Sequence, residues 1–164
     1  MIRIERYSDG RKADFERLNR EWIEQHFSIE PEDLRLFADP RGEIVDRGGE
    51  IFFAIDAGAN VPGGTIGGEA VGTVAMIEHA PHAFELAKMG VTPAYKGRGV
   101  GRLLMNAAIE FARERGKREI VLLTNSILTP ALRLYESVGF ERMPNVADNR
   151  FARVDLEMVL RLAR

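Results

Sequence analysis

The sequence predicts an α/β domain in which helices flank a sheet of several strands. Apolar residues recur at spacings of three and four in two long segments, as amphipathic helices require. Shorter segments either alternate or are continuously apolar and rich in Val, Ile and Thr, which is typical of strands. A chain of 164 residues with 45% apolar composition is long enough for one good core. We therefore expect a single domain over residues 1–164.

The amino-terminal half is predicted to contain one strand, two helices and two further strands. The first residues alternate apolar and charged side chains, and the following apolar stripe has helical spacing until it ends before Pro31. The predicted elements are a strand at 1–6, helices at 15–27 and 32–38, and strands at 51–56 and 70–78, the last two joined by a glycine-rich hairpin connection at 57–68.

The carboxy-terminal half continues with alternating strands and helices. A strand–helix–strand order implies a right-handed crossover, which places the two strands parallel or nearly adjacent. Thr129 is the expected N-cap of a short helix, with Pro130 at its first position and Gly139 at its end. The predicted elements are a strand at about 84–91, a helix from 100 to 115, a strand at 120–123, a helix from 130 and a closing strand at 150–162.

Charge and cysteine content narrow the classes of partner. The chain has 23 Lys and Arg residues against 25 Asp and Glu residues, so it lacks the basic footprint of a nucleic-acid or anionic-membrane binder. It has no cysteine, which excludes disulfides, a thiolate nucleophile and cysteine-ligated zinc. No uninterrupted run of 18 apolar residues occurs, and the first residues do not resemble a signal peptide. We expect a soluble, cytoplasmic protein without nucleic-acid or membrane partners.

The segment from Lys96 to Arg102 is a glycine-rich turn between a predicted strand and a predicted helix. Its backbone N–H groups converge at a helix N-terminus, which favours anions. Glycines let a ligand approach the backbone, and the cations of Lys96, Arg98 and Arg102 can contact phosphate. A tight turn alone would explain such a cluster equally well. The Walker pattern is absent, and Arg102 stands where a dinucleotide fingerprint needs its third glycine.

Together with its neighbours, this turn resembles the acetyl-CoA-binding motif of the GNAT superfamily of N-acetyltransferases. That motif has Gln or Arg, two residues, Gly, one residue and then Gly or Ala. Here Lys96 stands at the first position, and Gly99 and Gly101 supply the glycines. Residues 131–140, which include Leu-Tyr-Glu and Gly-Phe, resemble the second motif of the family, and residues 150–158 are similar to the closing pattern of one branch.

The resemblance implies a fold and a co-substrate. The fold is the acyl-CoA N-acyltransferase fold, classed as α/β or as α+β, with a mixed, mostly antiparallel sheet of six to seven strands flanked by helices. The co-substrate is acetyl-CoA. The backbone of residues 89–91 would pair with its pantetheine arm, and the amides of residues 98–102 would hold its pyrophosphate. The implied binding residues are Met89, Gly90, Val91, Lys96, Gly97, Arg98, Gly99, Val100, Gly101, Arg102 and Asn125.

Two of these positions carry further expectations. A bulge in the strand would open a V-shaped gap beside its parallel neighbour, and Gly90 is the candidate for it, since glycine tolerates bulge geometry. The side chain of Asn125 either contacts the co-substrate at the mouth of that gap or forms a turn. Leu128 stands where the family often has an Asn, so Asn125 or Ser126 would have to replace that contact.

The resemblance also implies two catalytic residues. Tyr135 matches the usual acid of the family, which protonates the departing thiolate, although an aromatic residue on a short helix can equally fill the core. Glu85 lies where histone-acetylating members place the carboxylate that takes the amine proton through water, although a glutamate at the start of a strand is commonplace.

The acceptor side is less defined. Trp22, His26 and Phe27 belong to a region that helps line the acceptor site in similar proteins, although Trp22 and Phe27 also suit a core. His79 and His82 have metal-compatible spacing without a carboxylate cluster, so we expect no metal site.

The function expected from these residues is acetyl transfer from acetyl-CoA to a primary amine, by direct attack in a ternary complex. The acceptor would be a small molecule or a peptide. A non-catalytic acyl-CoA-binding or sensing module is the alternative, because the co-substrate motif would serve either function. A terminal strand at the sheet edge could pair across a homodimer.

Overall fold

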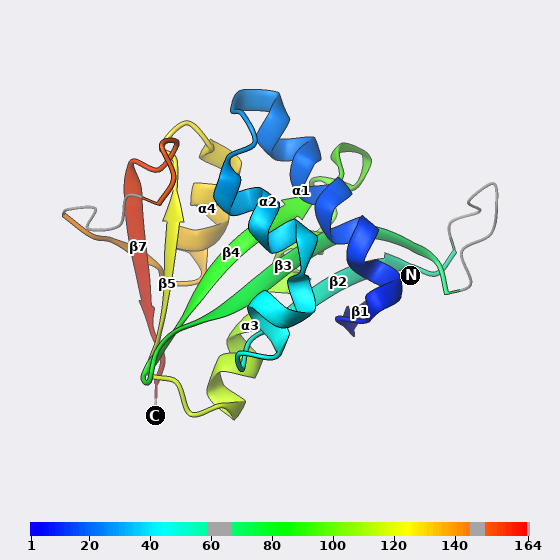
Figure 1. The fold of residues 1–164 in the computed structure, drawn as a ribbon. Coiled ribbons are helices and arrows are strands. Elements are labelled where there is room, and N and C mark those ends of the chain that lie inside the picture. The colour runs from blue at the N-terminus through cyan, green and yellow to red at the C-terminus, as the bar shows by residue number, and fades with distance from the viewer. Residues whose placement is uncertain (59–66, 145–149, 164) are drawn as a thin grey trace.

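In the part of the chain that the structure describes, the strands form a single mixed sheet of seven, with helices on both faces (Figure 1). The computed structural model describes residues 1–58, 67–144 and 150–163. The strand order is β1-β2-β3-β4-β5-β7-β6, and neighbours are antiparallel except for the parallel pair β4 and β5. The strands are β1 (Ile2–Arg6), β2 (Glu50–Asp56), β3 (Glu69–Ala80), β4 (Ala83–Val91), β5 (Glu119–Thr124), β6 (Glu141–Arg142) and β7 (Leu156–Arg161). The predicted fold class is confirmed.

Within the described residues, four α-helices pack on the two faces of the sheet, with an apolar layer under each pair. Helices α1 (Lys12–His26) and α2 (Pro31–Ala38) cover one face, and α3 (Val100–Glu114) lies on the opposite face (Figure 1), where α4 (Thr129–Ser137) also packs. Phe111 of α3 stacks on Phe84 of β4, with ring centroids 5.2 Å apart. On the other face, Phe15 of α1 meets Phe37 of α2 edge to face. The sheet is therefore covered on both sides, as a parallel pair requires.

Three boundary predictions differ from the structure. The N-cap of α4 is Leu128, so Thr129 is already helical, because Leu132 donates to the Leu128 carbonyl and starts the helix one residue early. The closing strand is shorter than residues 150–162, since only Leu156–Arg161 pairs with β5, while β6 was not predicted at all. Most of the predicted connection at 57–68 lies outside the described residues.

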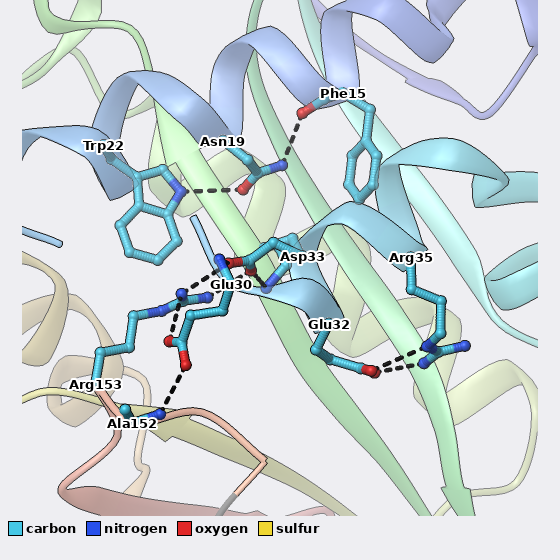
Figure 2. A network of polar contacts seen from close by, with 10 residues as sticks. Phe15, Asn19, Trp22, Glu30, Glu32, Asp33, Arg35, Ala152 and Arg153 are labelled. Carbon is cyan, nitrogen blue, oxygen red and sulfur yellow. Dashed lines mark hydrogen bonds and ion pairs between the residues drawn. The ribbon is translucent and has the colours of Figure 1, made fainter. Parts of the chain in front are cut away.

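A buried carboxylate joins α2 to the sheet and to the segment before β7. Asp33 is fully buried and accepts hydrogen bonds from both terminal nitrogens of Arg153, at 2.6 and 2.8 Å (Figure 2). Lys88 of β4 places its Nζ 2.7 Å from the same carboxylate. Asp33 also accepts the Glu30 backbone N–H and so closes a capping box at the start of α2. One side chain thus connects three segments that are distant in sequence.

The surroundings of Asp33 hold it in the ionised form. Burial opposes ionisation, but the hydrogen bonds from Arg153 and the charge of Lys88 outweigh it and lower the pKa of Asp33 from 3.8 to about 2. Because the carboxyl is more acidic in the folded chain than in the unfolded one, its ionisation stabilises the fold above pH 3.8. That contribution is lost as the pH falls toward 2.

Replacing Asp33 with Asn should therefore destabilise the protein in a pH-dependent way. At pH 7 we expect a loss of about 3–5 kcal/mol in the free energy of unfolding, because Lys88 and Arg153 lose their common counter-charge. As the pH falls toward 2, the unfolding free energies of variant and wild type should converge. Urea denaturation at several pH values measures both, with Glu110→Gln on the exposed face of α3 as the control. An equal gap at pH 7 and pH 2.5 would contradict the assignment.

Candidate active site

The parallel strands β4 and β5 part near their carboxyl ends. Their last paired residues are Leu86 and Leu122, yet β4 continues to Val91. Ala87–Val91 therefore has β3 on one side and no β5 partner on the other. A cleft of about 500 Å³ begins at this parting and is lined by both strands, the glycine-rich turn, the end of α1 and α4. Unpaired strand edges of this kind accept an extended ligand as an additional strand.

The bulge predicted at Gly90 lies two residues earlier. Gly90 pairs with Thr73 in regular register. The register between β3 and β4 shifts between this pair and the pair formed by Ala87 and Ala75. Lys88 adopts φ of +52°, a left-handed conformation that other residue types adopt far less readily than glycine. The bulge prediction for Gly90 is thus wrong in position, because a lysine with a buried partner occupies the left-handed site.

Gly90 has a different reason to be glycine. A Cβ built on it would lie 2.6 Å from Trp22 Cδ1 and 3.1 Å from the Leu18 carbonyl oxygen. Helix α1 thus approaches β4 as closely as the backbone allows. Gly90 lines the cleft and sets how near the wall formed by α1 can come.

The glycine-rich turn delivers the chain into α3. Gly97 and Gly99 have φ of +78° and +79°, and Gly99 is the N-cap of α3. The first intrahelical bond runs from the Leu103 N–H to the Gly99 carbonyl. The N–H groups of Val100, Gly101 and Arg102 precede that bond, which is the arrangement that favours an anion at a helix N-terminus.

The three cations of the turn differ in their positions. Lys96 lines the cleft together with Gly97, Gly99, Val100 and Gly101. Arg98 lies outside the lining, with its guanidinium over the Tyr95 ring at 5.0 Å. Arg102 also lies outside it and donates to the Ser137 hydroxyl at 2.8 Å. Of the cations predicted to contact phosphate, Lys96 has the most direct access to the cleft.

Tyr135 belongs to both the core and the cleft. Its side chain is 7% exposed, its ring packs against Phe140 at 5.8 Å between centroids, and it also lines the cleft. Burial raises the pKa of Tyr135 to about 12, so the phenol stays protonated near neutral pH. Within the described residues its hydroxyl makes no hydrogen bond. The core position expected as an alternative is therefore compatible with a proton-donating hydroxyl in the cleft.

Glu85 is buried, in contrast to an ordinary glutamate at a strand start. It is 4% exposed, lies inside β4 and lines the cleft. Its Oε1 accepts a hydrogen bond at 2.7 Å from Arg150, which precedes β7. A buried carboxylate with a cationic partner is available to bind an ammonium group or take its proton.

Asn125 lines the cleft, but its side chain is hydrogen-bonded to the protein backbone. Its Nδ2 donates to the Arg153 carbonyl at 2.7 Å, and its Oδ1 accepts the Ile127 N–H at 2.9 Å. The second bond closes the turn that we expected as the alternative role of Asn125. Ser126 binds Asp155 through both its N–H and its hydroxyl, so these bonds join the end of β5 to the segment before β7.

Part of the cleft wall consists of aromatic rings. Trp22 and His26 line the cleft from the end of α1, Phe27 from the residue after it, and Phe151 from the segment before β7. Lys88 and Arg153 each place a cation 4.5 Å from the Phe151 ring centroid.

Sequence reasoning did not assign roles to Lys88, Phe151, Arg153 or Asp33. The available signal was a lysine between apolar neighbours in a strand, since a buried lysine requires a partner. The position of that partner on α2 has no local signature.

Comparisons with known proteins agree with this geometry. The profile of the Acetyltransferase (GNAT) family matches residues 13–140. A mycothiol acetyltransferase of Corynebacterium glutamicum is 35% identical over 74 residues, which are 45% of this chain and 25% of that protein. The N-alpha-acetyltransferase RimI of Mycobacterium tuberculosis is 41% identical over 81 residues, 49% of each chain. This chain thus matches half or less of the length of these curated relatives.

Solved structures show the same fold along the whole chain. An acetyltransferase of Staphylococcus aureus Mu50 superposes with a TM-score of 0.85 at 18% identity, covering 99% of this chain and 100% of that one. YncA of Salmonella typhimurium, solved with its cofactor acetyl-CoA, superposes with a TM-score of 0.71 at 20% identity, covering 100% of this chain and 95% of that one. No helix in the described ranges is both long and apolar enough to cross a membrane. The family profile covers most of the chain, which therefore belongs to the GNAT family of acetyltransferases.

Proposed function

We propose that this protein transfers the acetyl group of acetyl-CoA to a primary amine by direct attack within a ternary complex. The observation that carries the proposal is that one cleft brings together the free edge of β4, the N-terminus of α3, Tyr135 and Glu85. In this proposal the peptide groups of Met89, Gly90 and Val91 pair with the pantetheine arm. The helix N-terminus and Lys96 bind the pyrophosphate.

The chemistry forms one bond and breaks another. The amine nitrogen attacks the thioester carbonyl carbon, so that a C–N bond forms and the C–S bond breaks. The amine attacks in its neutral form, and the proton that its nitrogen carries in excess afterwards passes through a water molecule to Glu85. Tyr135 donates its hydroxyl proton to the departing thiolate sulfur, and solvent carries the proton of Glu85 back to the Tyr135 phenolate. The two residues lie on β4 and α4, on separate walls of the cleft.

In this proposal the acceptor binds beside the aromatic side chains of the cleft wall. Trp22, Phe27 and Phe151 can pack against the body of an amine, while Glu85 binds its ammonium group. The two curated relatives described above are named for different acetylation reactions, so their names do not select one acceptor.

A thiol-release assay across a panel of amines tests the proposed function. With acetyl-CoA present, we expect release of free coenzyme A that depends on at least one amine of the panel, and calorimetry should show acetyl-CoA binding. Polyamines, amino acids, arylalkylamines and peptide N-termini make up the panel. Lack of acetyl-CoA binding would refute the proposal, whereas binding without turnover on any amine would favour the sensing module.

Replacing Tyr135 with Phe tests the assignment of the acid. We expect kcat to fall by about 10²-fold or more, because the thiolate loses its proton donor, while acetyl-CoA affinity changes little. Initial rates of thiol release measure kcat, and calorimetry measures the affinity for acetyl-CoA. Tyr7→Phe, remote from the cleft, is the matched control. Full turnover in Tyr135→Phe would remove Tyr135 from the mechanism.

Replacing Glu85 with Gln tests the assignment of the base. The rising limb of the pH–rate profile should move to higher pH, since only deprotonated amine then reacts without assistance. Initial rates from pH 6 to 10 at saturating acetyl-CoA provide the profile. Glu119→Gln, at the start of β5, controls for the loss of a carboxylate elsewhere. An unchanged profile in Glu85→Gln would show that another group accepts the proton.

A further inference from the structure

The side chains of β4 change their alternation in the middle of the strand. Phe84 and Leu86 face the core beneath α3, whereas Ala87 pairs with Ala75, which belongs to the core beneath α1 and α2. Regular alternation would send Lys88 to the α3 side and Met89 to the α1 side. The structure shows the reverse. Lys88 meets Asp33 of α2, and Met89 packs against the α3 core.

The bulge at Lys88 produces this reversal. An extra residue in one strand shifts the register by one, and a shift of one residue moves every following side chain to the other face. After the bulge, Met89 lies beneath α3 and Gly90 faces Trp22 of α1. Without the bulge, the Met89 side chain would point toward α1, as Gly90 does now. There is no room for it there, because even a Cβ on Gly90 would lie 2.6 Å from Trp22. The close approach of α1 therefore depends on the conformation of Lys88.

A buried ion pair holds that conformation. A lysine in the left-handed region is strained, and its Nζ is removed from water with a side chain only 4% exposed. Burial lowers the pKa of Lys88, and the Asp33 carboxylate at 2.7 Å is the charge that opposes this effect most strongly. Asp33 is in turn held by Arg153 and by the start of α2. In a strand without the bulge, the Lys88 side chain would point to the α3 side of the sheet, away from this carboxylate.

We propose that Lys88 is a positioning residue for the acetyl-CoA strand: its left-handed backbone, held by the ion pair with Asp33, sets the orientation of Met89, Gly90 and Val91 along the cleft. The proposal rests on the proposed function for the identity of the ligand. The reversal of faces itself is independent of any ligand.

A pair of substitutions that differ by one methyl group tests this role. Lys88→Gly and Lys88→Ala both remove the ion pair, but only glycine adopts a positive φ without steric cost. We expect Lys88→Ala to weaken acetyl-CoA binding, measured by calorimetry, at least five-fold more than Lys88→Gly does, because alanine favours the unbulged strand. Hydrogen–deuterium exchange of residues 89–91 in the ligand-free protein should rise in the same order.

Lys117→Ala is the matched control. Its ammonium is also buried and ion-paired, to Glu78, and it holds the turn between β3 and β4 at the other end of the same hairpin. It should lower the stability and leave acetyl-CoA affinity unchanged. If Lys88→Ala does not fold, Lys88→Asn and Lys88→Gln give the same comparison, since Asn adopts the left-handed conformation more readily.

The outcomes separate this inference from the proposed function. Equal affinity and equal exchange in Lys88→Ala and Lys88→Gly would overturn the positioning role, as would wild-type affinity in Lys88→Ala. If the wild-type protein binds no acetyl-CoA, the proposed function fails. The exchange measurement then still decides whether Lys88 sets the conformation of residues 89–91.

Discussion

The parting of β4 from β5 is the constraint on which the candidate site depends. Interior strands of a sheet normally pair on both edges, because an unpaired backbone group removed from water is costly. Here Ala87–Val91 leaves the edge facing β5 without a strand partner. A chain of amide groups, such as the pantetheine arm in the proposed function, satisfies such an edge by the same hydrogen bonds that a strand would make. The binding mode thus follows from backbone geometry more than from particular side chains.

Two glycines set how closely the helices approach this cleft. Gly90 allows Trp22 of α1 to lie against β4, and Gly101 allows Leu134 of α4 to lie against α3, where a Cβ would come within 3.1 Å of its Cδ2. Both glycines also line the cleft. A side chain at Gly90 would force Trp22 and the α1 backbone at Leu18 away from β4, whereas one at Gly101 would require the Leu134 side chain to shift.

The parts of this arrangement that could be predicted from sequence are those with local signatures. Helical stripes, the Lys96–Arg102 turn and the crossover to β5 follow from periodicity and glycine spacing, and the resemblance added Glu85 and Tyr135 as candidates. The bulge was misplaced because Gly90 has the conformational freedom expected of a bulge, whereas Lys88 acquires its left-handed backbone from an ion pair with a residue 55 positions away. The bonds of Asn125 with Arg153 likewise depend on tertiary contacts.

The buried charges beside the cleft are better explained as selecting one register of β4 than as stabilising the fold. Removing Lys88, Arg153 and Asp33 from water costs free energy that their attraction only partly recovers, and apolar residues of similar volume often stabilise a protein as well or better. An apolar side chain at position 88, however, could be buried in the core on either face of β4. A lysine that must reach one carboxylate fits only the bulged strand, so the ion pair selects one register where the backbone has two. That selection acts on β4, the strand with which the proposed co-substrate would pair.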